Sequence, residues 1–224
     1  MDKAGILELI ARSDLPERVK LCLAGSAAGA GGAGIKKALK KDPAALLAGV
    51  GGLLRSAAAI LALPEEAVLF VTGFNPNNAA PDRLEAALAE LRAVIFLDGQ
   101  GFGELGLVEQ SGSRTADLAG TRGGRRCVFE VCRLKETGVP AGAARLRAKY
   151  SKKIRQVKVS RKKCGGALGG LVLVDGQLGF GPLIPEPALL ALAAAASPVK
   201  DAACGEHLCL LRGDGYAVWP GWPL

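Results

Sequence analysis

The sequence predicts an α/β protein, in which a central mixed β-sheet is flanked by helices and preceded by an Ala/Gly-rich helical region. Three observations support this fold class. Residues 1–64 show apolar spacing typical of helices and are rich in Ala and Gly. After Pro64, short apolar runs of strand length alternate with segments of helical periodicity. A pair of short strands around a glycine turn lies near the centre of the chain. We therefore expect a helical region over 1–64 and an α/β domain over 65–224.

The N-terminal region is predicted to be helical and soluble. Residues 2–23 carry apolar helical faces with a break at Leu15 and Pro16, because proline disfavours a helix at the residue before it. Ala44–Leu63 is a run of twenty mostly apolar residues, long enough to span a membrane. Arg55 near its centre would cost about 2.5–3.5 kcal/mol there on insertion scales. We therefore expect one or two buried helices and no membrane contact.

A glycine-rich stretch between these helices matches a nucleotide-binding spacing. Gly29, Gly31 and Gly34 satisfy G-x-G-x-x-G, and Val19–Ala24 is a candidate strand before them. A dinucleotide site also needs a following helix, a second strand and an acid about 20 residues further on. The sequence near residue 54, GLLRSAAA, contains no acid. A low-complexity loop is favoured, and a nucleotide-binding enzyme using Gly29–Gly34 is kept as an alternative.

The α/β domain is predicted from periodicity, with strands at short apolar runs and helices at apolar stripes of 3.6 spacing. Asp82 is the predicted N-cap of the first of these helices. The expected elements in order are a strand at Ala67–Thr72, a helix at Asp82–Arg92, a strand or apolar continuation at Ala93–Leu97, strands Arg114–Gly120 and Arg126–Leu134 around a turn at Thr121–Gly124, a helix at Ala144–Ser160, a buried strand at Leu168–Val174, a helix at Pro187–Ala196, and a hairpin of His207–Leu211 with Tyr216–Trp219.

The strand Arg126–Leu134 carries an isolated acid. Side chains alternate along it, so Phe129 and Val131 point to one face while Glu130 points to the other among apolar neighbours. A buried, unpaired carboxylate is costly and requires a cation, a metal or a proton. Asp117 is predicted in the middle of the neighbouring strand, close enough for the two carboxylates to share one divalent ion.

Positive charge is concentrated in one helix. The formal net charge is +8, and ten Lys or Arg with no acid lie between Arg145 and Lys163, so the rest of the chain sums to 8 − 10 = −2. A local excess favours a polyanion-binding surface, with a solvated basic face as the alternative. The candidate nucleic-acid-binding residues are Arg145, Lys149, Lys152, Lys153, Arg155, Gln156, Lys158, Arg161, Lys162 and Lys163.

The pair of carboxylates resembles the PD-(D/E)XK nuclease superfamily, which has the restriction-endonuclease-like fold. That family carries an Asp on one strand and an acidic-x-Lys element on the next. Asp117 and Glu130 match these positions with twelve residues between them, whereas Cys132 occupies the Lys position and Ala116 replaces a frequent Pro. The resemblance implies a Mg²⁺ or Mn²⁺ site formed by Asp117, Glu130 and the carbonyl of Val131.

The implied activity is that of a Mg²⁺-dependent endonuclease, a hydrolase of nucleic-acid phosphodiester bonds, with DNA as the first candidate substrate. The family often carries Lys and Gln on the following helix, so Lys149 and Lys152 are expected to replace the missing catalytic Lys. Family members also place a Glu near the metal, for which Glu85, Glu90 and Glu104 are candidates, with solvent-facing carboxylates as the alternative for each. If no cation reaches the site, the domain is a catalytically degenerate, nuclease-like nucleic-acid-binding module.

The cysteines give an expectation about the compartment. Six are scattered along the chain, and the sequence MDKAGILELIARSD shows no secretory signal, so reduced thiols and a cytoplasmic protein are expected. Cys204, His207 and Cys209 lie close together without a fourth zinc ligand. Packing cysteines beside an exposed His207 are therefore favoured over a zinc site. Trp219 and Trp222 are expected to be packing residues, with base stacking as the alternative. The sequence is compatible with a monomer and with a homodimer.

Overall fold

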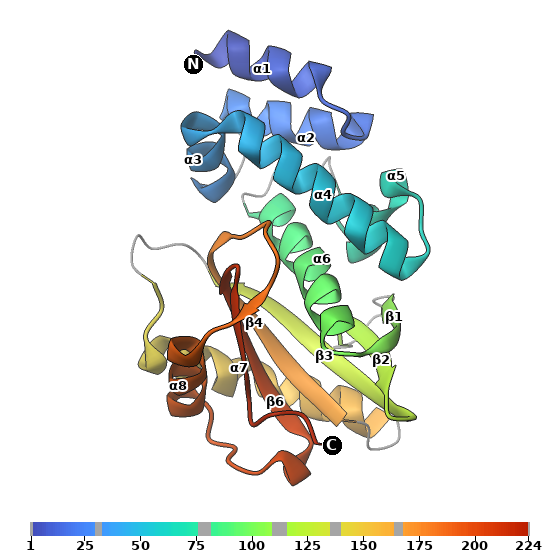
Figure 1. Cartoon of the computed structure of the whole chain (residues 1–224), viewed down its shortest axis with the longest axis vertical. Coiled ribbons are helices and arrows are strands. Elements are labelled where there is room, and N and C mark those ends of the chain that lie inside the picture. The colour runs from blue at the N-terminus through green and yellow to red at the C-terminus, as the bar shows by residue number, and fades with distance from the viewer. Residues whose placement is uncertain are drawn as a thin grey trace. The chain divides into compact units, whose positions relative to one another are not determined.

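The first part of the chain is helical, and the second part contains a β-sheet with flanking helices (Figure 1). The chain divides into two compact units, Met1–Arg92 and Ala93–Leu224, and the boundary falls within helix α6 (Arg83–Gly99). This computed structural model describes residues 2–29, 33–75, 82–108, 116–134, 140–163 and 168–223.

The first unit is built from short helices with defined start signals. The Asp2 carboxylate accepts a hydrogen bond from the Gly5 backbone N–H at 2.9 Å, and Asp42 accepts one from Ala45 at 3.0 Å. Besides the first part of α6, the helices are α1 (Lys3–Arg12), α2 (Glu17–Ala28), α3 (Ala33–Lys41), α4 (Pro43–Leu61), α5 (Glu65–Val68) and the 3-10 helix η1 (Phe70–Thr72).

Most of the apolar run Ala44–Leu63 forms a single helix, α4. Val50, Leu54 and Ala57 are fully buried on one side, whereas Arg55 is exposed. The helix is long and apolar enough to cross a membrane by length and composition alone. Its division into a buried face and a face that carries Arg55 is consistent with a core helix of a soluble protein.

Two strand predictions in the first unit were wrong. Ala67–Thr72 forms the end of α5 and then η1, because Glu65 and Glu66 follow Pro64 in a favourable first helical turn. Val68 and Leu69 are nevertheless fully buried, whereas Val71 in the same run is exposed. Val19–Ala24 lies within α2 and is not a strand.

The second unit contains a mixed seven-stranded sheet in the order β1-β2-β3-β4-β6-β7-β5. Its strands are β1 (Gly103–Leu107), β2 (Leu118–Arg122), β3 (Arg125–Leu134), β4 (Leu168–Leu178), β5 (Ile184–Pro185), β6 (Glu206–Gly213) and β7 (Gly215–Trp219). The pairs β1–β2, β2–β3 and β6–β7 are antiparallel, whereas β3–β4, β4–β6 and β5–β7 are parallel. The predicted α/β class with a mixed sheet and flanking helices is therefore confirmed.

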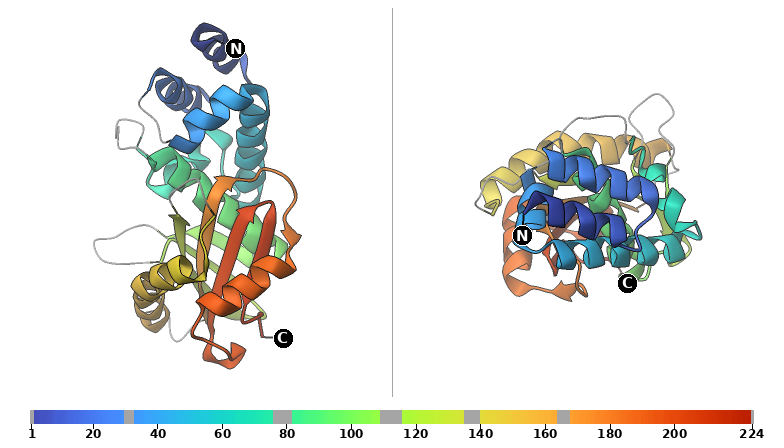
Figure 2. Two further views of the ribbon diagram at one scale, coloured as in Figure 1. Left: turned by 90° about the vertical axis from the view of Figure 1, so that its left-hand side faces the viewer. Right: turned by 90° about the horizontal axis from the view of Figure 1, so that it is seen from above.

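The two parallel connections in the centre of the sheet fix the positions of two helices. Helix α7 (Ala143–Lys163) links β3 to β4, and α8 (Pro187–Ala196) lies between β4 and β6. Successive crossovers in one direction with the usual right-handed sense place their helices on the same face of a sheet. Accordingly, α7 and α8 lie on the same face of the sheet (Figure 2). Leu146, Tyr150 and Val157 of α7 belong to one core cluster with Leu189 and Ala193 of α8.

An aromatic cluster covers the opposite face of the sheet. Phe129 of β3 contacts Phe102 edge-on at a centroid distance of 5.1 Å and Trp222 at 5.9 Å. Phe96 of α6 contacts Tyr216 of β7 at 5.4 Å. The alternation predicted for β3 is confirmed, because Phe129 lies on this face, whereas Cys132 and Leu134 join the α7 side. Both faces of β3 are therefore buried.

The turn of the central hairpin is shorter than predicted. Its turn is Gly123 and Gly124, whose φ values of 57° and 71° fit the tight two-residue turn that suits a twisted hairpin. Thr121 therefore belongs to β2 and not to the turn. Asp117 directly precedes β2 and does not lie in the middle of a strand, and Arg114 lies outside the described residues.

A buried ion pair anchors the segment that leads into α7. Asp175 of β4 accepts hydrogen bonds from the Ala141 backbone N–H at 3.1 Å and from Arg212 Nε of β6 at 2.9 Å. Arg212 Nη2 also donates to the Ala141 carbonyl at 2.8 Å. Because Asp175 is 2% exposed, it has little access to water as a replacement partner.

We predict that Asp175→Ala lowers the free energy of unfolding by about 2 kcal/mol, because it leaves the Ala141 N–H and the Arg212 guanidinium without their partner. Urea unfolding of the whole chain measures the change. The exposed Asp98 provides the control, since Asp98→Ala should alter stability by less than about 0.5 kcal/mol. Equal stability of the two variants would contradict the anchoring role.

Candidate functional site

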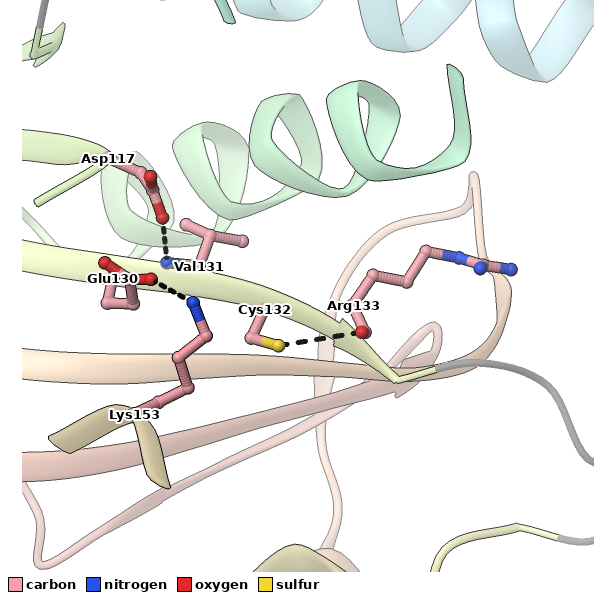
Figure 3. A network of polar contacts seen from close by, with 6 residues as sticks. All are labelled: Asp117, Glu130, Val131, Cys132, Arg133 and Lys153. Carbon is pink, nitrogen blue, oxygen red and sulfur yellow. Dashed lines mark hydrogen bonds and ion pairs between the residues drawn. The ribbon is translucent and has the colours of Figure 1, made fainter. Parts of the chain in front are cut away.

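Glu130 is held in the sheet by a lysine from the basic helix. It lies in β3 on the face covered by α7, and its side chain is 3% exposed. Lys153 Nζ of α7 reaches Glu130 Oε1 at 2.7 Å (Figure 3). The other carboxylate oxygen, Oε2, is buried and has no hydrogen-bond partner among the described residues. The predicted need of this carboxylate for a cation is thus met on one oxygen.

Asp117 lies beside Glu130 and terminates the β2–β3 ladder. Its backbone N–H donates to the Phe129 carbonyl at 2.9 Å, and its carboxylate Oδ2 accepts from the Val131 N–H at 2.7 Å (Figure 3). The side chain thereby replaces a backbone acceptor at the point where β3 extends beyond β2. Asp117 and Glu130 are therefore brought together, as the sequence predicted.

The site retains unbalanced negative charge. Burial and then the nearby Glu130 carboxylate raise the pKa of Asp117 to about 6, although the Val131 N–H and Lys153 oppose this. Burial by itself favours neutral Lys153, but the hydrogen bond and charge of Glu130 outweigh burial and raise the pKa of that lysine. One ammonium thus faces two carboxylates, and a further cation would stabilise both in the ionised form.

The oxygen atoms available at the site suit a hard cation. Glu130 Oε2 has no partner, and Asp117 has a second carboxylate oxygen besides the one bonded to Val131. The Val131 carbonyl faces the same edge of β3 as its N–H, because both groups of one residue point to the same side in a strand. No cluster of three or more His, Cys, Asp or Glu side chains occurs in the described part of the chain. Two carboxylates are nevertheless sufficient for Mg²⁺, which keeps several waters.

The lysine that reaches the site is not one of the two proposed for it. Lys153 contacts Glu130, whereas Lys152 is exposed, and Lys149 is half-buried and forms no ion pair with either carboxylate. Lys153 is three residues after Tyr150 and four before Val157, both of which face the sheet. By helical position, Lys149 and Lys152 lie farther from the sheet around α7 than Lys153 does. The spacing from Tyr150 and Val157 was the signal that could have identified Lys153.

The motif position after Val131 supplies no charge. Cys132 is buried, and its thiol donates to the Arg133 carbonyl at 3.6 Å. The Arg133 side chain points away from Glu130 (Figure 3). Lys135 lies outside the described residues. Lys153 is therefore the cation that the described residues bring to Glu130.

The flanks of α7 have different surroundings. Lys158 and Arg161 both approach Glu206 Oε1 of β6, at 3.5 and 3.3 Å. The Arg147 guanidinium donates to the Ala195 carbonyl of α8. These three residues lie on the flank away from Lys153, and their charges are already engaged by the protein. The residues on the Lys153 flank by helical position are Arg145, Lys149, Lys152, Gln156 and Lys163, whereas Arg155 and Lys162 are exposed farther from the sheet.

The acids proposed as additional metal ligands have other positions. Glu85 belongs to the first unit, where its carboxylate accepts a hydrogen bond from the Ile35 N–H at 2.8 Å. Glu90 also belongs to that unit. Glu104 is exposed in β1 with a positive φ of 49°.

The contact of Glu85 also bears on the glycine-rich loop. In a nucleotide site, phosphate binds the N–H groups at the start of the helix after such a loop. Here the Glu85 carboxylate takes the Ile35 N–H near the start of α3. Gly31 lies outside the described residues, but the preceding element, α2, is a helix where a strand is required.

The C-terminal His and Cys residues do not form a cluster. His207 is fully buried, contrary to the expected exposure, and its Nδ1 lies 2.9 Å from the Pro220 carbonyl. Cys209 is buried in β6 as predicted, but Cys204 is exposed in the 3-10 helix η2 (Ala202–Cys204). His207 packs against Trp222 at 4.6 Å because β6 is a central strand covered on both faces. The packing role predicted for Trp222 is confirmed.

Comparison of the chain with protein-family models, with curated proteins and with solved structures finds no match.

We predict that the stability of the protein falls between pH 4 and pH 7 because of Asp117. Its folded pKa of about 6 lies above the unfolded value, so the folded state holds an extra proton in this window and loses it as the pH rises. Asp117→Asn removes this titration and keeps an acceptor for the Val131 N–H. In EDTA, the stability of this variant relative to the original protein should rise by about 2 kcal/mol across the window. A pH-independent difference in urea unfolding would exclude the raised pKa.

Proposed function

We propose that this protein is a metal-dependent nuclease that hydrolyses phosphodiester bonds of nucleic acid, with DNA as the first candidate substrate. The observation that carries the proposal is the buried Glu130, bound by Lys153 and placed beside Asp117 with one carboxylate oxygen unpartnered. A structural ion pair would require only one acid and one base. The second carboxylate instead leaves a negative site that a divalent cation would complete.

The order of elements also supports the proposal. Helix α6 precedes three antiparallel strands, helix α7 and a strand parallel to the third. The hairpin β2–β3, the basic helix α7 and the strand β4 follow one another in the order expected from the sequence, whereas β1 was not expected and Ala93–Leu97 belongs to α6. Asp117 directly precedes the second strand instead of lying on it, and Glu130 lies on the third, so the two acids are near the positions that the resemblance implies. We therefore assign the restriction-endonuclease-like fold to the second unit as part of the proposal.

Each residue of the site has a defined task in this reaction. Asp117, Glu130 and the Val131 carbonyl would hold Mg²⁺ or Mn²⁺. Such an ion, when bound, makes a coordinated water more acidic and offsets charge on the phosphate. Lys153 orients Glu130 through their ion pair, and its ammonium supplies the positive charge that neutral Cys132 lacks. The flank of α7 that carries Lys149 and Lys152 would contact neighbouring phosphates.

A second candidate function is nucleic-acid binding without cleavage. Lys153 is already engaged with Glu130, and the motif lysine is replaced by Cys132. If Lys153 cannot serve a phosphate while it holds Glu130, the site would bind nucleic acid but leave it intact. Activity measurements separate these two functions.

We predict that the purified protein cleaves DNA with Mg²⁺ or Mn²⁺ and is inactive in EDTA. Glu130→Gln should lower the rate by at least about 10³-fold, because it removes the charge that attracts the metal. Lys153→Ala should lower the rate by about 10²-fold through loss of positive charge and of Glu130 orientation. Cys132→Ala is the matched control within β3 and should cleave at nearly the original rate, because a neutral thiol supplies no charge to the phosphate.

Cleavage in EDTA, or full activity of Glu130→Gln, would rule out this mechanism. If metal ions quench the fluorescence of the protein, and the protein binds DNA but never cuts it, these results would instead select the binding module. Thermal melting of each variant shows whether a loss of rate reflects unfolding. Glu130→Gln preserves the size of the side chain and is therefore the more informative variant than Glu130→Ala.

A further inference from the structure

The tip of the β2–β3 hairpin carries three arginines around its glycine turn. Arg122 precedes Gly123 and Gly124, and Arg125 and Arg126 follow them. The positive φ values of both glycines define a tight turn, which fixes where the flanking side chains emerge. Arg125 and Arg126 are exposed. The tip is therefore a compact basic projection at the start of β3.

The pairing within this tip is unfavourable for the protein alone. Arg122 lies directly across the hairpin from Arg125. Like charges directly opposite one another on paired strands are destabilising. None of the acids that the structure describes forms an ion pair with Arg125 or Arg126, and Glu104 of the adjacent strand β1 forms none. The repulsion is therefore not relieved by a described acidic neighbour, and an external polyanion would relieve it.

Arg122 is held in place by aromatic rings. Its guanidinium lies 5.4 Å from the Phe102 ring centroid and 5.8 Å from that of Trp222. Such contacts stabilise a cation and fix its orientation. Its Nη1 is buried without a hydrogen-bond partner in the described part of the chain. Arg122 thus cannot move away from Arg125 without losing these contacts.

The tip is aligned with the candidate site. Arg126, Val128 and Glu130 alternate with the intervening residues, so Arg126 shares the face of β3 that carries Glu130. Glu130 is four residues after Arg126 along the strand, which corresponds to about 13 Å between their backbones. Phosphates of one strand in a duplex recur about every 3.4 Å along the axis, so this distance equals about four base pairs.

We propose that the arginines of the hairpin tip bind the sugar-phosphate backbone of the nucleic acid about four base pairs from the bond aligned with Glu130. This inference rests on the proposed function, because the site sets the point from which the distance is measured. Arg125 and Arg126 make the phosphate contacts, and Arg122 braces the turn. The tight hairpin would then fix the distance between these phosphate contacts and the cleaved bond.

The test compares a hairpin variant, Arg125→Ser with Arg126→Ser, with a control variant of equal charge change. The control is Lys3→Ser with Arg12→Ser on helix α1, where Arg12 forms only an exposed ion pair with Glu8. Binding to a DNA duplex of about 20 base pairs is measured in EDTA by fluorescence anisotropy at several salt concentrations. The hairpin variant should reduce the slope of log K against log salt by about 1.8, and the control should leave it unchanged.

A cleavage assay in Mg²⁺ then tests the distance between the hairpin contacts and the cleaved bond. Duplexes shortened stepwise from one end should lose cleavage by the original protein when fewer than about four base pairs remain on the hairpin side. The hairpin variant should cut long and short duplexes at the same reduced rate. Its thermal midpoint should be no lower than that of the original protein, because the Arg122–Arg125 repulsion is removed.

The outcomes separate the two proposals. An unchanged salt slope in the hairpin variant overturns this inference, whether or not the protein cuts DNA. A reduced slope in a protein that never cuts keeps the hairpin surface and removes the nuclease function. If the hairpin arginines are required for binding poly-glutamate but not the duplex, an acidic protein partner replaces nucleic acid and the inference is overturned.

Discussion

The ion pair between Glu130 and Lys153 connects the features on which the second unit depends. Glu130 is placed in a strand that is buried on both faces, where a carboxylate without a cation would be destabilising. Lys153 can supply that cation only because the β3–α7–β4 crossover lays α7 across this face. Removing either partner would leave a charge in an apolar environment. The fold and the site therefore require the same helix position.

The presence of Asp117 distinguishes this ion pair from a purely structural salt bridge. A structural salt bridge would be complete with Glu130 and Lys153, but the second carboxylate adds a negative charge that burial makes unfavourable. Its hydrogen bond to Val131 also terminates the β2–β3 ladder, so the residue has a structural task. The combination of strand termination and unbalanced charge places the candidate metal site where β3 extends beyond β2.

Some basic residues of α7 form ion pairs within the protein, and others are available to a ligand. Glu206 neutralises Lys158 and Arg161, which ties the end of the helix to β6. The flank with Lys149 and Lys152 lies on the side of the helix from which Lys153 reaches Glu130. The run of ten basic residues thus contains residues that hold the helix to β6 as well as a candidate phosphate-binding surface.

Sequence periodicity predicted most of the second unit because its elements are long and strongly patterned. The helix at Pro187–Ala196 and the alternation along β3 follow directly from apolar spacing. Ala67–Thr72 was misassigned because a short apolar run fits a buried helix turn as well as a strand. The sequence singled out Lys149 and Lys152 because they share a flank of α7 with Lys153. The spacing of Lys153 from Tyr150 and Val157 brings it nearer to the sheet, and the packing of α7 on β3 decides which lysine reaches Glu130.

The most direct measurement of the central claim is the titration of the Asp117 carboxyl carbon by NMR, with and without Mg²⁺. The account predicts a midpoint near pH 6 in EDTA, because burial and Glu130 raise the pKa of Asp117. Saturating Mg²⁺ should lower this midpoint well below 6, because a divalent ion between the carboxylates favours their ionised forms. A midpoint that Mg²⁺ leaves unchanged would contradict a metal site at Asp117 and Glu130.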